Sequence, residues 1–225
     1  MNKKIYFILA LLLTLFFNTN SFTSSNGRAI MKKARERYNG NDAKSLVKMT
    51  LINRRGNRRV KVYRFYRIDY NRYGNGSKSI FVIKKPADAK GIIFLQWSYG
   101  SQHKTDDRWL YLPALKRVRR ISGSTARNSF LGSDLSYEDL SIGNRSVDLD
   151  NFKVIKEETI NGEKCWVIKV TPKDSSYLYS KYITWISQKT YVSLKSKFFD
   201  QNGRLWKIMQ AKDVRKIQNV WTVLK

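Results

Sequence analysis

The stretch that decides the fold is DDRWLYLPALKRVRRISGSTARNSFLGSDLSYEDL, residues 106–140. It begins as a strand in which Trp109 and Tyr111 point to one side and the intervening leucines to the other. Pro113 ends or bends that strand. A basic run at 115–121, a Gly/Ser-rich turn, an apolar pair and an acidic cluster follow. This one segment combines apolar, basic and acidic side chains. We expect it to be functional, because loops on a rigid scaffold often carry function.

Outside this stretch the pattern predicts strand after strand. Residues Arg59–Asp69 alternate along the chain, as a half-exposed strand does. The pair Asn161-Gly162 is a strong hairpin signal, and Gln188-Lys189 indicates a second hairpin. Ile217–Leu224 is the last strand candidate. About ten strands with little helix predict a mainly β chain, folded as a barrel or a sandwich.

One amphipathic helix is expected over Arg28–Tyr38, with Gly40 ending it. Its apolar residues recur at helical spacing and should pack on a sheet. The expected outward-facing residues are Lys32, Lys33, Arg35 and Arg37.

Composition indicates one folded domain over residues 25–225, because 225 residues with 42% hydrophobic and 13% aromatic content can build a core. The formal charge of +27 permits two interpretations. It reflects either a soluble, lysine-rich surface or attraction to an anionic partner.

Residues 1–24 have the pattern of a signal peptide. Lys3 and Lys4 precede the apolar run Ile5–Phe17, and a polar stretch with small residues follows. The apolar run is short for a membrane span, so a cleaved signal is favoured over an anchor and a periplasmic location is expected. Cys165 is the only cysteine and is expected to be a small buried hydrophobe.

The segments WLYLPALKRVRRIS (109–122) and FLGSDLSYEDL (130–140) closely resemble the signature of the outer-membrane lipoprotein-sorting protein-like family. Further matching pieces are GRAIMKKARERYNG (27–40) and FVIKKPADAKGIIFL (81–95). The resemblance implies the fold of the Lol lipoprotein carriers: a half-open antiparallel β-barrel with an N-terminal helix packed on it. It also implies an apolar cavity that accepts acyl chains. Family members usually continue with further strands beyond the point where this sequence stops, which leaves two expectations open: a truncated C-terminus or a shorter barrel.

Catalytic signals are weak. The lone His103 lies in a polar turn, and one His with one Cys cannot assemble a His/Cys zinc set. No phosphate loop, nucleophile elbow or zinc-protease motif is present. We therefore expect a non-enzymatic protein without cofactor or metal, whose carboxylates form salt bridges with its many cations.

The candidate site combines two sets of residues. Apolar side chains are expected to form the wall and lid of the cavity, although ordinary core packing would produce the same pattern. Opposite charges on either side of one turn are expected to pair and pin the 122–140 segment over the barrel mouth. The cavity set is Phe94, Trp97, Trp109, Tyr111, Phe130 and Leu131, and the pinning set is Arg117, Arg119, Arg120, Asp134, Glu138 and Asp139.

Two functions compete. The favoured one is a periplasmic, monomeric carrier of lipid or lipoprotein acyl chains, with an inner-membrane export transporter as a plausible partner. The alternative is a binding module for an anionic envelope polymer, suggested by the interleaved basic and aromatic residues of YRFYRIDYNRYG (63–74). An exported chain is not expected to bind nucleic acid.

Overall fold

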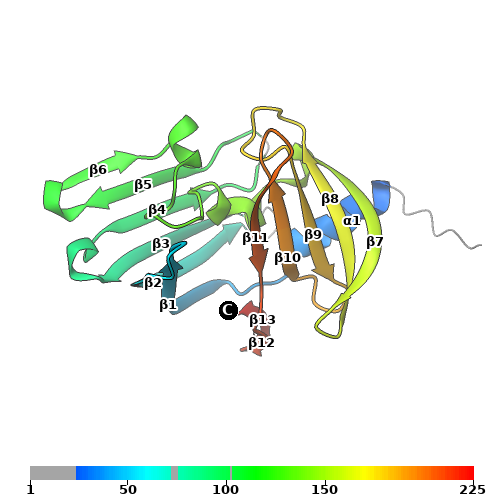
Figure 1. Cartoon of the computed structure of the whole chain (residues 1–225), viewed down its shortest axis with the longest axis horizontal. Helices are drawn as coiled ribbons and strands as arrows, with labels where there is room; N and C mark the ends of the chain where they lie inside the picture. Colours follow the sequence, from blue (N-terminus) through cyan, green and yellow to red (C-terminus); the bar gives the residue numbers. More distant parts are fainter. Residues whose placement is uncertain (1–23, 72–75, 102) are drawn as a thin grey trace, which may run out of the picture.

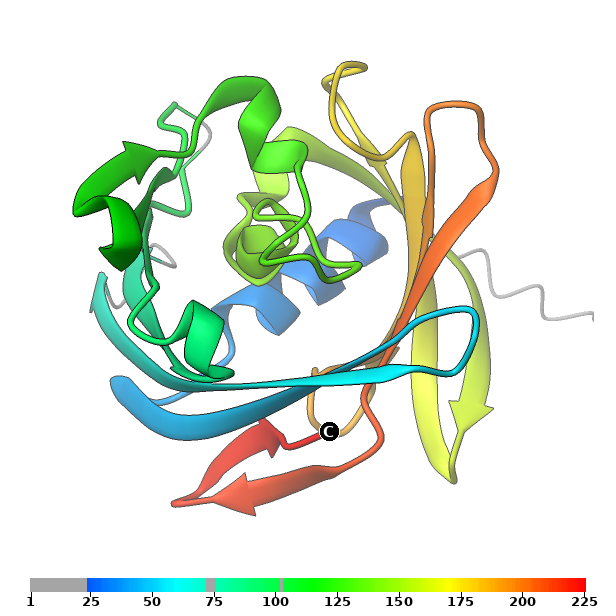
Figure 2. The same ribbon diagram turned by 60° about the vertical axis from the view of Figure 1, so that its left-hand side comes forward.

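The computed structural model describes residues 24–71, 76–101 and 103–225. Two large antiparallel sheets curve around a shared interior without closing into a barrel, and one α-helix lies between them (Figures 1 and 2). The first sheet has the order β1-β2-β3-β4-β5-β6 and the second the order β11-β10-β9-β8-β7. The predicted fold, a half-open β-barrel with an N-terminal helix, is confirmed. The predicted signal segment lies outside the described residues except for Ser24, which begins the helix.

The elements have the following bounds: α1 Ser24–Glu36, β1 Asp42–Ile52, β2 Arg58–Asn71, β3 Gly76–Lys85, β4 Ile93–Ser98, β5 Asp107–Leu112, β6 Arg117–Arg120, β7 Asp150–Ile160, β8 Glu163–Pro172, β9 Lys181–Ser187, β10 Ser193–Phe199, β11 Leu205–Gln210, β12 Val214–Ile217 and β13 Val220–Val223. Short 3-10 helices are η1 Ala87–Ala89, η2 Pro113–Leu115, η3 Gly123–Arg127, η4 Asp139–Asn144 and η5 Val147–Leu149.

Turn chemistry fixes several strand pairs. Asn161 and Gly162 have positive φ angles of 51° and 81°, and they join β7 to β8 as predicted. Gln218 and Asn219 also have positive φ angles, 48° and 64°, and they join β12 to β13. The prediction of one strand over Ile217–Leu224 is therefore wrong, because a Gln-Asn turn splits it into a hairpin.

Helix α1 packs on the concave side of the second sheet. Ile30 and Met31 are buried in one cluster with Phe152 of β7. Arg35 lies four residues after Met31 and so shares its face of the helix. It is buried and donates to the Asp150 carboxylate at 2.9 Å, so its predicted outward orientation is wrong.

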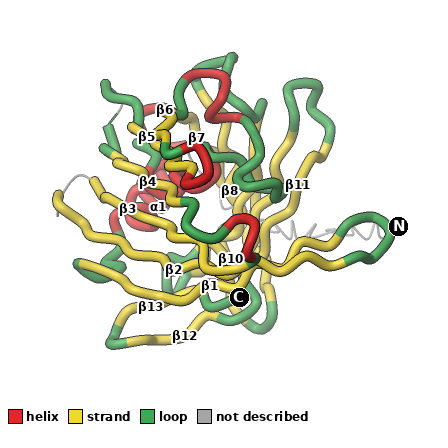
Figure 3. Tube along the Cα trace, turned by 90° about the vertical axis from the view of Figure 1, so that its left-hand side faces the viewer, coloured by secondary structure: helices red, strands yellow, loops and turns green. Residues whose placement is uncertain are grey.

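Residues 121–149, which connect β6 to β7 and hold η3, η4 and η5, lie inside the space between the two sheets (Figure 2). We call this segment the plug. Figure 3 shows its 3-10 turns and α1 in red among the strands.

Cys165, on β8, is fully buried as predicted. Burial, followed by the nearby Glu163, raises the pKa of its thiol to about 11. In the described part of the chain, no helix has the length and apolar character needed to span a membrane.

Candidate functional site

The concave face of the first sheet forms an apolar cup. Its side chains follow from strand alternation: Phe81, Phe94 and Leu110 are mutual neighbours on β3, β4 and β5 and all point inward. Tyr63 of β2 and Ile83 of β3 complete the buried surface. The cup is thus lined with the aromatic and branched groups that would suit a hydrocarbon ligand.

One side chain of the plug, that of Phe130, fills this cup. Phe130 has no solvent exposure, and its ring centroid lies 5.5 Å from that of Phe81 and 5.4 Å from that of Phe94. Tyr137 of the plug closes the cluster, 5.6 Å from Phe130 between ring centroids. The interior of the cup is packed in this state.

A tight turn delivers Phe130 into the cup. Its amide donates to the Leu135 carbonyl at 2.6 Å, and Ser129 and Ser136 form an isolated bridge. Leu131 has a φ of 51°, an unfavourable conformation for a leucine. The Lys61 ammonium donates to the Leu131 carbonyl, and burial, followed by the nearby Arg59, lowers the pKa of that lysine. The turn is held by contacts from the sheet, and strained backbone of this kind is concentrated at functional sites.

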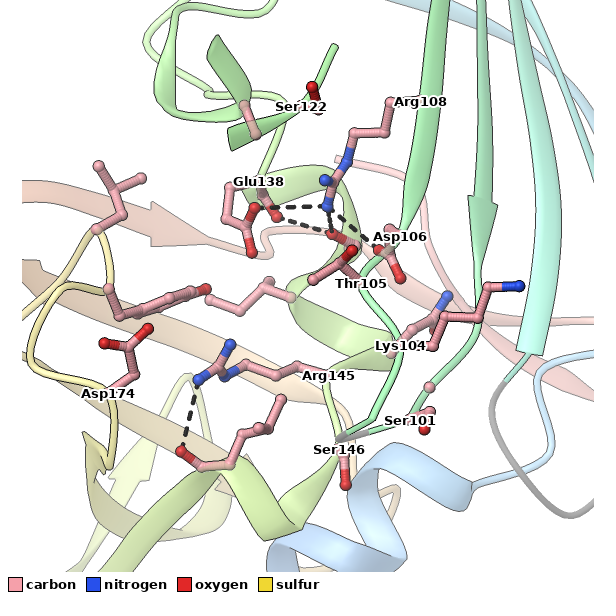
Figure 4. A pocket seen from close by; sticks show the side chains of 18 of the residues that line it. Ser101, Lys104, Thr105, Asp106, Arg108, Ser122, Glu138, Arg145, Ser146 and Asp174 are labelled. Carbon is pink, nitrogen blue, oxygen red and sulfur yellow. Dashed lines mark hydrogen bonds and ion pairs between the residues drawn. The ribbon is translucent and has the colours of Figure 1, made fainter. Parts of the chain in front are cut away.

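A cavity of about 470 Å³, with many charged and polar residues in its lining, adjoins the cup (Figure 4). Ala126 belongs to the buried cluster of the cup and also lines the cavity, so the two spaces meet at the plug. Five Lys or Arg side chains and three carboxylates are among the residues that line it. They are Lys104, Arg108, Arg120, Arg127, Arg145, Asp106, Glu138 and Asp174.

Arg108 is the central cation of this cavity and is almost completely buried. Its guanidinium lies 3.2 Å from the Asp106 carboxylate and 3.5 Å from that of Glu138, and it donates to the Ser141 hydroxyl at 2.7 Å (Figure 4). Burial raises the pKa of Glu138, and the positive charge of Arg108 only partly opposes that rise. The site therefore joins β5 to the plug through one charged contact.

Arg145 lies across the cavity from Arg108. Its guanidinium stands 4.0 Å from the ring centroid of Tyr177, and its Nε donates to Asp150 at 3.0 Å. The Tyr177 hydroxyl is buried and has no hydrogen-bond partner within the described residues, and burial, followed by the charge of Glu138, raises its pKa. A buried polar group without a partner is costly, so it marks a place where a polar ligand atom would be stabilised.

The six predicted cavity residues fall on two faces of the first sheet. Phe94 and Phe130 are in the packed cup, and Leu131 lies half-buried at its rim. Trp97, Trp109 and Tyr111 lie on the opposite, outer face, because each is adjacent in sequence to an inward residue. Their assignment to a shared cavity wall is therefore wrong.

The predicted pinning pairs also differ from those observed. Arg120 pairs with Asp107, while Arg117 and Arg119 are exposed and form no salt bridge within the described residues. Glu138 pairs with Arg108 instead. Asp139 pairs with Lys207, and Asp134 contributes only its backbone carbonyl to the same lysine. Glu138 and Asp139 thus form ion pairs that hold the plug, but with Arg108 and Lys207 and not with the predicted cations.

Sequence reasoning missed Arg108, Lys61, Lys207 and Tyr179. Arg108 could have been found, because alternation places it on the inward face with Leu110. Nothing in the local pattern brings Lys207 or Tyr179 to the plug, since both belong to the second half of the chain.

The basic and aromatic run at 63–74 is divided by the same alternation; its residues 72–74 lie outside the described part. Tyr63 is buried in the cup, whereas Arg64 and Tyr66 lie on the outer face. The run therefore does not form one continuous stacking surface.

Among the described residues, no three His, Cys, Asp or Glu side chains are grouped so as to hold a metal ion.

Comparison with known proteins identifies the class. A family model described as "Uncharacterized protein" matches residues 75–225. A DUF1329 family protein from Desulfovibrio piger is 32% identical, with a TM-score of 0.82 over 89% of this chain and 83% of that one. A domain from Vibrio parahaemolyticus described as an outer-membrane lipoprotein-sorting protein is 31% identical, with a TM-score of 0.79 over 89% and 83%.

A LolA superfamily protein from Nitrosomonas europaea shares the fold at 22% identity, with a TM-score of 0.59 over 85% of this chain and 79% of that one. No curated protein matches the chain. The fold is thus that of the lipoprotein-sorting class of proteins. Within that class, the chain belongs to the DUF1329 family.

Proposed function

We propose that this protein is a non-enzymatic carrier of the bacterial cell envelope that binds an amphiphile between its two sheets. The acyl chain would occupy the apolar cup, and the polar head group would occupy the cavity around Arg108 and Arg145. The observation that carries the proposal is that Phe130, from a segment without strands, fills the cup. The plug takes the place in the cup that an acyl chain would take.

An acyl chain and the apolar side chains of the plug can bury similar amounts of hydrocarbon surface in the cup. Burying hydrocarbon contributes about 0.8 kcal/mol per methylene, so a long acyl chain can replace the apolar contacts of Phe130 and its neighbours. Partly exposed apolar residues at the rim of the cup (Val47, Met49, Phe65, Leu131 and Leu135) mark the side from which a chain would approach. The excess of cations in the cavity would favour an anionic head group.

The similarity to outer-membrane lipoprotein-sorting proteins supports a carrier role, and the predicted signal segment supports a periplasmic location. Under this proposal a membrane transporter for lipid or lipoprotein would supply the ligand. Native mass spectrometry of the exported, purified protein tests it, with oleate and phosphatidylglycerol each added in excess. The expected result is a one-to-one adduct, and the absence of any adduct with both lipids would refute the proposal.

A polyanion-binding function is less well supported, because strand alternation places Tyr63 on the inward face and Tyr66 on the outer face of β2, so its aromatic rings do not form one continuous stacking surface.

A further inference from the structure

The outer face of the first sheet carries an apolar surface that the carrier function does not use. Six side chains on β4, β5 and β6 form it, and the strand register places them as neighbours: Leu95 beside Trp109, Ile93 beside Tyr111, and Tyr111 beside Val118. Trp97 extends the row on β4. We call Ile93, Leu95, Trp97, Trp109, Tyr111 and Val118 the outer patch.

The outer patch is partly open to solvent. Val118 is 65% exposed and Leu95 is 37% exposed, and the other four are half-buried against one another. The six residues lie on one face of three consecutive strands of the sheet, so the patch is a continuous surface. By contrast, Val214 and Trp221 of the β12–β13 hairpin pack against a buried cluster of the second sheet. Contiguous exposed apolar surface of this kind marks an interaction site.

Cations accompany the patch. Lys78 of β3 lies with its ammonium 3.9 Å from the ring centroid of Trp97, and Arg64 is exposed on the same face of β2, which is separated from β4 by β3. Trp97 stacks on Tyr99, whose ring lies 3.7 Å from the Lys104 ammonium. On this face of β3 to β6 the one carboxylate is Asp107, and it is already paired with Arg120. The surface is therefore apolar and aromatic at its centre and positive at its edge.

We propose that the outer patch docks the protein on an anionic phospholipid bilayer. Tryptophan and tyrosine are the residues that prefer the membrane interface, and long basic side chains reach the lipid phosphates while their stems cover apolar surface. A surface that spans three adjacent strands of the sheet suits a flat partner such as a bilayer. A second copy of this chain would bring the same positive edge against itself in a protein of formal charge +27, which disfavours self-association. The proposal goes beyond the carrier function, because the patch lies on the opposite side of the sheet from the cup.

Vesicle flotation tests the docking proposal without reference to acyl binding in the cup. The probes are vesicles of phosphatidylcholine alone and vesicles containing about one third phosphatidylglycerol. The wild-type protein is expected to float with the anionic vesicles and to remain in solution with the neutral ones. The double variant Leu95→Gln/Val118→Gln should lose at least about tenfold in binding, because both side chains are exposed and their change removes apolar contact with little effect on the fold.

A matched apolar control is Leu205→Gln/Ile208→Gln, two residues of β11 that are 51% and 53% exposed. The charge variant Lys78→Gln/Arg64→Gln should lose about 25-fold, at about fivefold per cation near an anionic membrane. Its control is Lys153→Gln/Lys169→Gln, an exposed lysine pair on β7 and β8.

Failure of the wild type to bind anionic vesicles would overturn the docking proposal, as would equal losses in the patch variants and their controls. Dimers seen by sedimentation and abolished by Leu95→Gln/Val118→Gln would overturn it in favour of a self-association surface. A protein that floats but shows no adduct in native mass spectrometry would support docking while refuting the carrier function.

Discussion

Lys207 of β11 donates to the Asp139 carboxylate at 2.7 Å and so binds the plug from the second sheet. Tyr179 donates to the other carboxylate oxygen of Asp139 at 2.5 Å, and the amide of Ser136 donates at 2.7 Å to the same oxygen as Lys207. Asp139 is almost completely buried. Because Phe130 of the same segment is packed in the first sheet, the plug connects the two halves of the molecule and its contacts determine whether the cup is filled.

Asp139→Asn should loosen the plug. The substitution keeps the size of the side chain but removes the charge that Lys207 pairs with, and breaking one buried ion pair costs about 3–5 kcal/mol. Limited trypsin digestion at Arg127 and Arg145 should become at least tenfold faster, since about 1.4 kcal/mol already corresponds to tenfold. The matched control is Asp134→Asn, because only the backbone carbonyl of Asp134 contacts Lys207. Equal digestion rates in the two variants would contradict this role of Asp139.

Asp150→Asn should destabilise the whole fold. The Asp150 carboxylate is fully buried between Arg35 of α1 and Arg145 of the plug, at 2.9 Å and 3.0 Å. Its loss leaves the buried Arg35 and the partly buried Arg145 without their counter-charge, and the free energy of unfolding should fall by about 3–5 kcal/mol in urea titrations. Asp148→Asn removes a solvent-exposed pair with Arg28 and should cost at most about 1 kcal/mol. If both variants lost a comparable free energy of unfolding, the buried ion pairs of Asp150 would contribute no more than the exposed pair of Asp148.

Glu138 should make the stability of the wild type depend on pH. Burial raises the pKa of this carboxyl in the folded state above its ordinary value of 4.5. As the pH rises above 4.5, the unfolded chain loses that proton before the folded chain does, so stability declines through this window. Glu138→Gln cannot titrate, so its free energy of unfolding relative to the wild type should increase as the pH rises through the same window. A difference that stays constant with pH would contradict the raised pKa.

Phe130→Ala should empty part of the cup. The free energy of unfolding should fall by about 3–5 kcal/mol, as for other buried phenylalanines. Fluorescence of an apolar naphthylamine probe should increase in this variant, because the probe gains access to the space that the ring vacates. Phe198→Ala is the control, since Phe198 is equally buried but belongs to the cluster of the second sheet. Should the alanine variant fail to fold, Phe130→Leu offers the same test with a smaller change. Equal probe binding in the variants of Phe130 and Phe198 would argue against a special role for the cup.

The sequence predicted the class of the fold because its signals are local. The turn pair at Asn161-Gly162 and the alternation of Arg59–Asp69 each depend on neighbouring residues, and both are found where expected. The hairpin around Gln218-Asn219 was missed, because glutamine seldom adopts positive φ and gives a weak turn signal.

The candidate site was harder to predict because its contacts are remote in sequence. Phe94 and Phe130 were placed correctly near one another, but their cavity proved to be packed by the plug itself. Trp109 and Tyr111 were assigned to the wrong face, although strand alternation relative to Leu110 already separates them from the cup. The partner of Asp139 could not be inferred, since Lys207 lies 68 residues away and meets it only after both sheets have formed.

Competition between the plug and an acyl chain for one cup is tested most directly by affinity measurements with a fluorescent long-chain fatty acid. If the plug must leave before the ligand binds, the apparent dissociation constant is raised by the small fraction of open molecules. Asp139→Asn should therefore bind the fatty acid at least about tenfold more tightly than the wild type, while Asp134→Asn should bind it with unchanged affinity. An unchanged or weaker affinity in Asp139→Asn, in a variant whose plug is more easily digested, would contradict the account.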